Sequence, residues 1–172
     1  AVKLTTNQSI AGEKTFTEAV TIGDRIKFGS ANNVKIGSSA LSSVNNETTA
    51  ERNIAIGYYS LPILQQNAAN VDNISIGVFS GYNTGTGGTL AYVNKSIFIG
   101  TNTKPATNNG TNEIVIGDTA IGNGSNTATL GNDSITDTYL KGDVQTNGSL
   151  TVTGNVGIGT DSPDNRLEIV GT

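Results

Sequence analysis

A four-residue signature, apolar-x-apolar-Gly, recurs along the chain and constrains the fold more than any other feature. Five copies end at Gly37, Gly57, Gly77, Gly100 and Gly117, and looser copies end at Gly131 and Gly159. The first five glycines are 20, 20, 23 and 17 residues apart, and Asn precedes the first three copies. Such a period is typical of stacked repeats, in which each unit buries its apolar face against its neighbours. We therefore expect one strand, one corner and one return segment in each repeat.

The alternation within the signature predicts which side chains share a face of each strand. Successive side chains of a strand point to opposite faces, so the two apolar residues lie together and the middle residue lies opposite. We expect the apolar pair to face a shared core and the middle residue to face water, where Lys35, Ala55 and Ser75 are tolerated. The predicted core positions are Ile36, Ile54, Ile56, Ile74, Ile76, Ile97, Ile99, Ile114 and Ile116.

The composition leaves little material for a thick core in a single copy. Only 35% of the residues are hydrophobic and 14% are charged, against about 45–50% and about 25% in ordinary globular domains. Disorder is disfavoured, because the net charge is only −4 and β-branched residues are abundant in short alternating runs. The remaining interpretation is a thin, repetitive β structure whose core is completed by neighbouring chains.

The sequence predicts an all-β fold with short repeated strands, Gly/Asn turns and three segments. Residues 1–30 are expected to form a β-hairpin or shaft segment, and residues 31–131 a β-roll built from the repeats. Residues 132–172 are expected to form a second β shaft with short strands near 134–140, 144, 149–153 and 166–170. The irregular spacing after Gly77 predicts that the stacking becomes less regular beyond about residue 80.

Four stretches carry a resemblance to known fibre proteins. Residues 33–41 and 53–61 (Asn-Ile-Ala-Ile-Gly-Tyr-Tyr-Ser-Leu in the second) resemble the Asn-x-Ala-Ile-Gly repeats of phage tail fibres and of trimeric autotransporter adhesin heads. Residues 7–16 (Asn-Gln-Ser-Ile-Ala-Gly-Glu-Lys-Thr-Phe) resemble a segment of long tail fibres. Residues 155–169 resemble the strand that precedes a self-cleaving chaperone domain in such fibres.

The resemblance implies an elongated trimeric β-helix or β-roll fibre, in which three parallel chains wrap around one axis. The implied role is a structural segment of a homotrimeric phage tail fibre that supports host recognition and attachment, in the extracellular virion tail. Implied partners are other tail or fibre proteins and a host surface glycan or outer-membrane receptor, and a chaperone domain is expected downstream. Two alternatives remain open: the head of a bacterial trimeric surface adhesin, and a tailspike-like polysaccharide depolymerase.

Several function classes are disfavoured by what the sequence lacks. His and Cys are absent, which removes the commonest general base and the thiolate ligands of metal sites. The pI of 4.6 and the lack of any Lys/Arg cluster argue against nucleic acid as a partner. No apolar run approaches the about 18–20 residues of a membrane-spanning helix. We therefore predict no cofactor, no bound nucleic acid and no membrane insertion.

The carboxylates and glycines offer no clear catalytic motif. Glycosidases need two positioned carboxylates, whereas the Asp and Glu residues here, Glu113 and Asp133 among them, are scattered singly in turn-like contexts. The Gly-rich stretches 85–88 and 122–124 lack the Gly-Lys-Ser/Thr that completes a phosphate loop. Residues 161–164 are interpreted as a capping turn rather than a calcium loop. We predict that the chain is not an enzyme.

Aromatic residues gather between positions 58 and 98 and are the candidates for a binding surface. The candidates are Tyr58, Tyr59, Tyr82, Tyr92 and Phe98. Phe98 occupies the middle position of its signature, which we expect to face outward. An exposed aromatic cluster suits stacking on a glycan or contact with a protein. The alternative, which the sequence favours, is packing between repeats, between chains or under the 82–92 loop.

Overall fold

The computed structural model describes residues 32–42, 50–62, 70–88, 90 and 92–171 of the 172-residue chain. All of the regular secondary structure within these ranges is β. The chain divides into two units, residues 1–135 and 136–172, which are described separately. The hairpin predicted for residues 1–30 lies outside the described ranges. The prediction of an all-β fold is confirmed for the rest.

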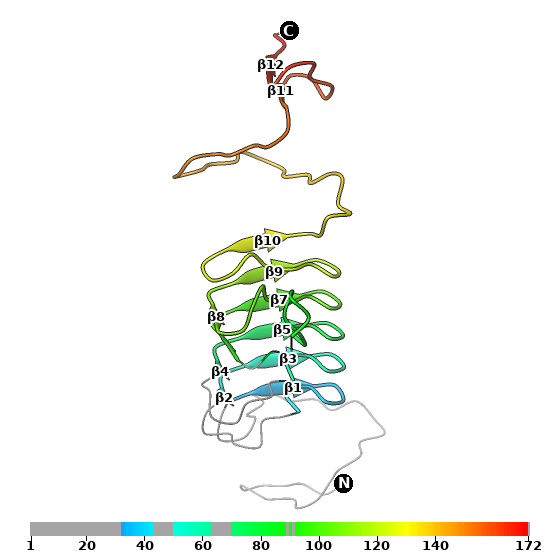
Figure 1. The fold of residues 1–172 in the computed structure, drawn as a ribbon, viewed down its shortest axis with the longest axis vertical. Coiled ribbons are helices and arrows are strands. Elements are labelled where there is room, and N and C mark those ends of the chain that lie inside the picture. Colours follow the sequence, from blue (N-terminus) through cyan, green and yellow to red (C-terminus); the bar gives the residue numbers. More distant parts are fainter. Residues whose placement is uncertain (1–31, 43–49, 63–69, 89, 91, 172) are drawn as a thin grey trace, which may run out of the picture. The chain divides into compact units, whose positions relative to one another are not determined.

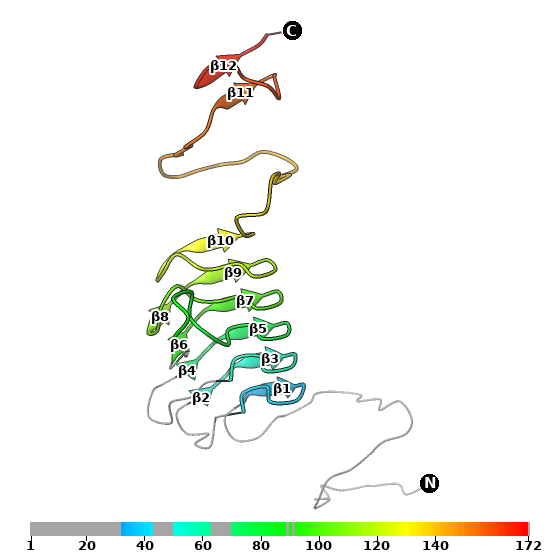
Figure 2. The ribbon, with the colours of Figure 1, turned by 45° about the vertical axis from the view of Figure 1, so that its right-hand side comes forward.

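The signature copies of the first unit form one parallel sheet of six strands, and their order in the sheet is their order in the chain (Figures 1 and 2). Each repeat therefore makes one coil that stacks on the previous one. Short strands in the return segments pair in the same way, β2 with β4 and β6 with β8. The sheet strands are β1 (Val34–Ile36), β3 (Ile54–Ile56), β5 (Ile74–Ile76), β7 (Ile97–Ile99), β9 (Ile114–Ile116) and β10 (Ala128–Leu130). The return strands are β2 (Ala50–Glu51), β4 (Asn70–Val71), β6 (Val93–Asn94) and β8 (Gly110–Thr111).

The register of the sheet is the same in every coil. Ile74 pairs with Ile54 on one side and with Ile97 on the other, so that like residues lie above like residues. This register continues from β7 to β9 and from β9 to β10. The irregularity predicted beyond residue 80 is therefore wrong for the sheet, because the differences in repeat length are taken up in the return segments.

A column of glycines ends these strands, and the geometry there excludes other residues. Gly37 has a φ of 120°, and a Cβ placed on it would lie 2.6 Å from the carbonyl oxygen of Gly57 in the next coil. Gly57 has a φ of 130° and faces the carbonyl of Gly77 in the same way. Side chains are disfavoured both by this backbone conformation and by the close approach of the next coil. The glycine of the signature is thus required by the stacking itself.

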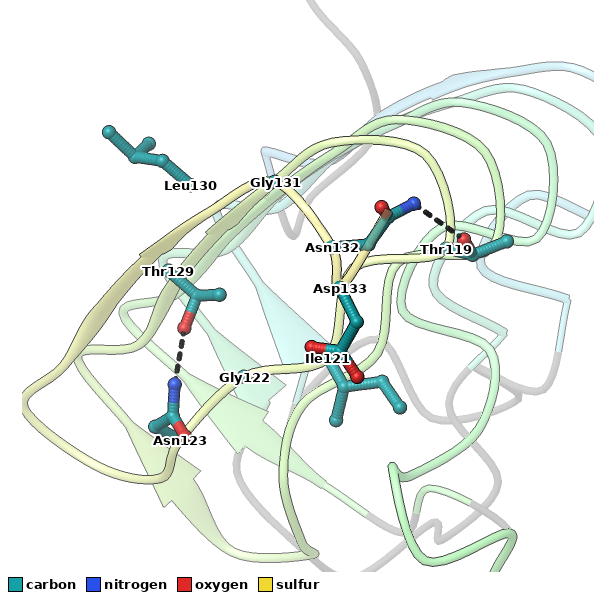
Figure 3. Close-up of a pocket in the computed structure, with 9 residues that line it drawn as sticks. All are labelled: Thr119, Ile121, Gly122, Asn123, Thr129, Leu130, Gly131, Asn132 and Asp133. Carbon is teal, nitrogen blue, oxygen red and sulfur yellow. Dashed lines mark hydrogen bonds between the residues drawn. The ribbon is translucent and has the colours of Figure 1, made fainter. Parts of the chain in front are cut away.

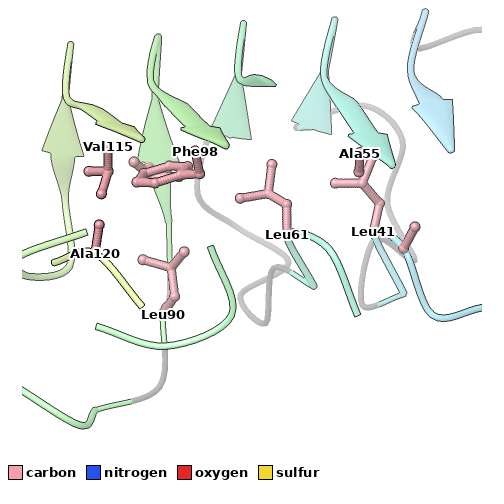
Figure 4. Packing of buried hydrophobic residues seen from close by; sticks show 9 residues of the cluster. Leu41, Ala55, Leu61, Leu90, Phe98, Val115 and Ala120 are labelled. Carbon is pink, nitrogen blue, oxygen red and sulfur yellow. The ribbon is translucent and has the colours of Figure 1, made fainter. Parts of the chain in front are cut away.

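The core of the first unit lies on the face of the sheet that carries the middle residue of each signature. Ala55, Ser75, Phe98 and Val115 are completely buried there. They pack against the residues that follow each corner and return, chiefly Leu41, Leu61, Leu90 and Ala120 (Figure 4). The prediction that the middle residues face water is therefore wrong, whereas the prediction that the isoleucines face a core shared between chains stays a prediction. The middle residues face the interior of the coil, and the isoleucines lie on the opposite, outer face.

The physical reason for this reversal is the narrowness of the coil. The segment across the coil lies close to the sheet, so each coil has room for one inward side chain from its sheet strand. Where that side chain is small, a larger residue across the interior fills the space, and the reverse. Ala55 and Ser75 are small, whereas Phe98 lies near Leu61 and Gly81 and fills the space between coils. Lys35 remains exposed in β1, the first strand of the sheet.

A ladder of buried amides joins the first three coils at the corner before each sheet strand. Asn33 Oδ1 accepts hydrogen bonds from the backbone N–H and the Nδ2 of Asn53, at 2.9 and 3.2 Å. Asn53 Oδ1 accepts the equivalent pair from Asn73, at 3.0 and 2.9 Å. Asn53 Nδ2 also donates to the carbonyl of Asn70 at 2.7 Å. Each buried amide is therefore satisfied by its neighbours, which explains why Asn precedes these strands.

The second unit contains one pair of parallel strands, β11 (Val156–Ile158) and β12 (Leu167–Ile169), with Val156 opposite Leu167. The strands predicted near 134–140, 144 and 149–153 are absent from the described residues, which are irregular and mostly exposed there. Their alternating sequence has no neighbouring strand in the described chain with which to form a ladder. Apolar alternation alone does not make a strand when its backbone groups lack a partner.

Candidate functional site

The outer face of the six-stranded sheet is lined by apolar side chains in every strand. We call it the isoleucine face, and it consists of Val34, Ile36, Ile54, Ile56, Ile74, Ile76, Ile97, Ile99, Ile114, Ile116, Ala128 and Leu130. The second residue of the pair is exposed in β1, β5, β7 and β10, with 53% of Ile36, 37% of Ile76, 36% of Ile99 and 61% of Leu130 open to solvent. Scattered exposed apolar residues are common, whereas a continuous apolar face makes this side of the sheet a candidate interaction surface.

All nine isoleucines predicted as core positions lie on this face, where the register brings them into two parallel columns. The alternation correctly placed the members of each pair together. These pairs do not lie in the interior of the single chain. Within each strand the isoleucine face carries no polar or charged side chain, because those positions are apolar in all six strands. A second protein surface would therefore meet an uninterrupted apolar sheet.

Four aromatic rings form a cluster at the corners after β3 and β5. Tyr58 and Tyr59 come from the first corner, Phe79 and Tyr82 from the next. Tyr59 stacks on Phe79 with ring centroids 5.8 Å apart, and Tyr82 meets both rings edge-on at 5.7 and 5.4 Å. Tyr58 is 47% exposed, while the other three are partly buried. The cluster thus packs successive coils together and leaves mainly one ring open to solvent.

The other two aromatic candidates lie elsewhere. Phe98 is completely buried in the core, so its predicted role on the surface is wrong. The reason is the orientation of the strand, which turns the middle residues of β3, β5, β7 and β9 inward. Tyr92 lies in the return segment before β6 and is partly buried. Its backbone carbonyl accepts a hydrogen bond from the N–H of Asn109 at 3.1 Å.

A hollow of about 400 Å³ opens beside β10, at the last strand of the sheet (Figure 3). Two side-chain hydrogen bonds frame it: Asn123 Nδ2 donates to Thr129 Oγ1 at 3.0 Å, and Asn132 Nδ2 donates to Thr119 Oγ1 at 3.1 Å. Asp133 projects between these two pairs. The lining residues are Thr119, Ile121, Gly122, Asn123, Thr129, Leu130, Gly131, Asn132 and Asp133.

A buried carboxylate supports one wall of the hollow. Glu113 is completely buried, and its Oε1 accepts hydrogen bonds from the backbone N–H groups of Ala106 at 3.1 Å and Gly124 at 2.9 Å. Its Oε2 has no hydrogen-bond partner among the described residues. A side chain at Gly122 would overlap the Glu113 carboxylate, so glycine is required there. Glu113 therefore holds the loop 122–124 in place.

The sequence-based view of Glu113 as a solvated turn residue is wrong. Its burial was indicated by its position in the repeat, because Glu113 occupies the place of Asn33, Asn53 and Asn73 in the earlier copies. That position faces the interior of the coil, and its backbone N–H is bonded to Ser96 Oγ at 3.1 Å. The hollow itself was not predicted, because it forms where two segments, residues 119–123 and 129–133, come together at the last strand of the sheet.

The exposed charges of the first unit include an ion pair between successive coils. Arg52 Nε lies 2.6 Å from Asp72 Oδ1, and Arg52 Nη1 lies 2.7 Å from Glu51 Oε2. The hydrogen bond from Arg52 holds the pKa of Asp72 below its ordinary value, and the same bond raises the pKa of Arg52. Both groups lie at the surface, so the pair contributes little to stability in salt.

The described residues contain no group of three or more His, Cys, Asp or Glu side chains placed to hold a metal ion. The turn at 161–164 is held by a hydrogen bond from the Ser162 N–H to Thr160 Oγ1 at 3.2 Å and by one from the Asp164 N–H to Glu168 Oε2 at 2.6 Å. In the part of the chain that the structure describes, no helix has the length and apolarity to cross a membrane. Comparisons with protein-family models, curated proteins and solved structures found no match to this chain.

Proposed function

We propose that this chain is a structural segment of a homotrimeric β-helical fibre, of the kind that a phage tail uses for attachment to its host. The observation that carries the proposal is the isoleucine face. Its apolar side chains lie on the outside of the coil, while the interior is already filled by Phe98, Val115 and the leucines opposite. Within the described coils, these buried apolar side chains are already packed in the interior and do not cover this face.

Copies of the same chain are the occupants that fit the face best. Its side chains recur at the spacing of neighbouring strands, about 4.8 Å, and an identical parallel chain presents the same spacing. Each partly exposed Ile or Leu side chain covered in this way contributes on the order of 1 kcal/mol, so the ten Ile and Leu positions supply about 10 kcal/mol per chain. This is comparable to the whole stability of an ordinary domain. Assembly and folding are expected to be coupled.

The resemblance of the repeats to tail-fibre sequences supports three copies around one axis. It also supports an extracellular location and a mechanical role, in which the stacked coils hold a receptor-binding part at a distance. A bacterial trimeric adhesin head shares the same assembly, and neighbouring genes distinguish the two: tail genes in one case, an outer-membrane anchor in the other. A polysaccharide depolymerase is tested by incubating the chain with host capsule and measuring new reducing ends.

Sedimentation equilibrium of the full chain tests the assembly. The expected mass is three times the 17.6 kDa of one chain. Ile99→Asp places a charge on the isoleucine face and is expected to abolish the trimer. Thr111→Asp is the matched control, because it adds the same charge at an exposed position in β8. A wild-type chain that stays monomeric and folded, or an Ile99→Asp variant that still forms trimers, contradicts the proposal.

A further inference from the structure

We propose that the hollow beside β10 is a saccharide-binding site that takes a single uncharged sugar unit, a hexose or an N-acetylhexosamine. The inference rests on the proposed function only for the source of the sugar, a glycan on the host surface. The site itself belongs to the first unit of one chain, since all of its lining residues lie between Thr119 and Asp133. It adjoins the isoleucine face at Leu130 and shares no residue with the aromatic cluster.

The polar groups of the hollow match the hydroxyl groups of a sugar. The Asp133 carboxylate makes no hydrogen bond or ion pair with any described residue, so both of its oxygens can accept from hydroxyls. Asn123 uses its Nδ2 to hold Thr129, which leaves its Oδ1 to accept. Thr129 Oγ1 accepts that bond and keeps its own proton to donate. Acceptors and a donor therefore converge on one volume, as sugar recognition requires.

An apolar side chain completes the lining. Ile121 is 48% exposed and, in Figure 3, lies beside the Asp133 carboxylate. The C–H groups of a pyranose ring pack on such a surface while its hydroxyls meet the polar side chains. The volume of about 400 Å³ lies at the lower end of the range for small-molecule sites, about 300–1,000 Å³. One sugar unit fits this space, and a longer chain would extend through the open mouth.

The wall of the hollow is held in place before any ligand binds. Glu113 fixes the loop 122–124 from the buried side through its bond to the Gly124 N–H. Asn132 is fixed on the opposite side by bonds to Thr119 Oγ1 and to the carbonyl of Asp118 at 2.7 Å. A site whose walls are already ordered loses less conformational entropy on binding. This construction distinguishes the hollow from an ordinary surface loop.

The charge of the hollow selects against acidic sugars. Asp133 is the charged residue of the lining, and Asp118 lies nearby through its contact with Asn132. Lys104 pairs with Ile121 through a β-bridge but does not line the hollow, and no Lys or Arg is among the lining residues. A uronate or a phosphate would therefore meet a carboxylate without a compensating cation. Uncharged sugars are expected to bind and uronates are not.

Saturation-transfer NMR on the full chain tests this inference. The probes are the methyl glycosides of glucose, galactose, N-acetylglucosamine and glucuronate, each at millimolar concentration. At least one uncharged glycoside is expected to show transfer and glucuronate none. Asp133→Ala and Asn123→Ala are each expected to weaken binding about tenfold or more, because each removes a direct hydrogen bond. Asp161→Ala, which removes the same charge in the second unit, is expected to leave binding unchanged.

Three results overturn the inference: no transfer from any uncharged glycoside, equal binding by the two hollow variants and the wild type, or binding of glucuronate as strong as that of glucose. Sedimentation equilibrium on the same samples separates this inference from the proposed function. A trimer that binds no sugar refutes the saccharide site alone. A folded monomer that binds sugar through Asp133 refutes the trimer and leaves the site intact.

Discussion

Replacing Phe98 by alanine removes the largest completely buried side chain of the described core. The transfer of a buried Phe side chain to water costs about 1.5–3 kcal/mol. The cavity left behind adds to this, so that Phe→Ala changes in cores cost about 3–5 kcal/mol in total. The wall near Phe98 is formed by Gly81 in the coil before it and by Leu61 one coil further back. Coils joined by backbone ladders cannot collapse freely, so the upper half of that range is expected.

Urea denaturation followed by circular dichroism measures the change in the free energy of unfolding. Ile99→Ala is the matched comparison, because Ile99 is the next residue of the same strand and is 36% exposed on the opposite face. Each variant is measured at two protein concentrations. Both changes lower stability in an assembled fibre. For Ile99→Ala the loss is expected to come mainly from weaker association, and hence to be largest in dilute samples.

The reasoning about the interior is refuted by a small effect at Phe98. A residue that faces solvent changes stability by no more than about 0.5 kcal/mol when it is truncated. A value in that range for Phe98→Ala would restore the orientation predicted from the sequence, with the middle residue outside. An m-value that falls sharply in the variant would instead indicate that only part of the stack unfolds with Phe98.

Three further predictions address the stacking of the coils. In thermal unfolding scans, Gly77→Ala is expected to lower the free energy of unfolding by at least about 3 kcal/mol, because the added methyl group meets the Gly100 carbonyl and the backbone φ is 133°. Gly87 has open space around it, so Gly87→Ala is the control and is expected to cost only about 1 kcal/mol. Asn53→Ala is expected to cost about 2–4 kcal/mol in urea, because it leaves buried amide groups of the ladder unpaired; a loss below about 0.5 kcal/mol would count against the ladder. Because the pKa of Asp72 is lowered in the folded chain, its contribution is complete above the unfolded pKa and is lost as the pH falls through the folded pKa. Melting curves of the wild type and Asp72→Asn should therefore differ slightly at neutral pH in low salt and converge below about pH 4; a difference that grows in acid would reverse this assignment.

The sequence allowed the strands and their glycine turns to be located, because both are local properties. Each copy of the signature forms a strand, and the position of each glycine follows from a backbone approach that no side chain permits. It was also predictable that the two isoleucines of each strand share a face, since alternate residues of a strand point the same way. What alternation cannot tell is which face lies inside. That depends on the residues across the coil, such as Leu61 and Leu90, whose position is set by the return segments.

The candidate site was harder to predict because it depends on contacts between coils. Asn123 and Thr129 are six residues apart, yet they meet only because the loop 122–124 folds over Glu113. The position of Glu113 in the column of asparagines indicated that it is buried, whereas its charged carboxylate predicted exposure to solvent. The aromatic cluster was foreseen as a group of residues, while the inward direction of Phe98 followed from the strand orientation that the pattern left undetermined.

The two sides of each coil differ in how much sequence change they accept. On the sheet side, each glycine from Gly37 to Gly100 meets the carbonyl of the next, and a single added residue would break that contact. On the return side, the coil that contains the turn at Thr84–Gly88 is longer than its neighbours, and the turn closes on itself through a bond from the Thr84 N–H to the Gly88 carbonyl at 2.9 Å. An epitope or an affinity tag inserted after the exposed Thr86 would therefore extend into solvent without changing the rise from one coil to the next.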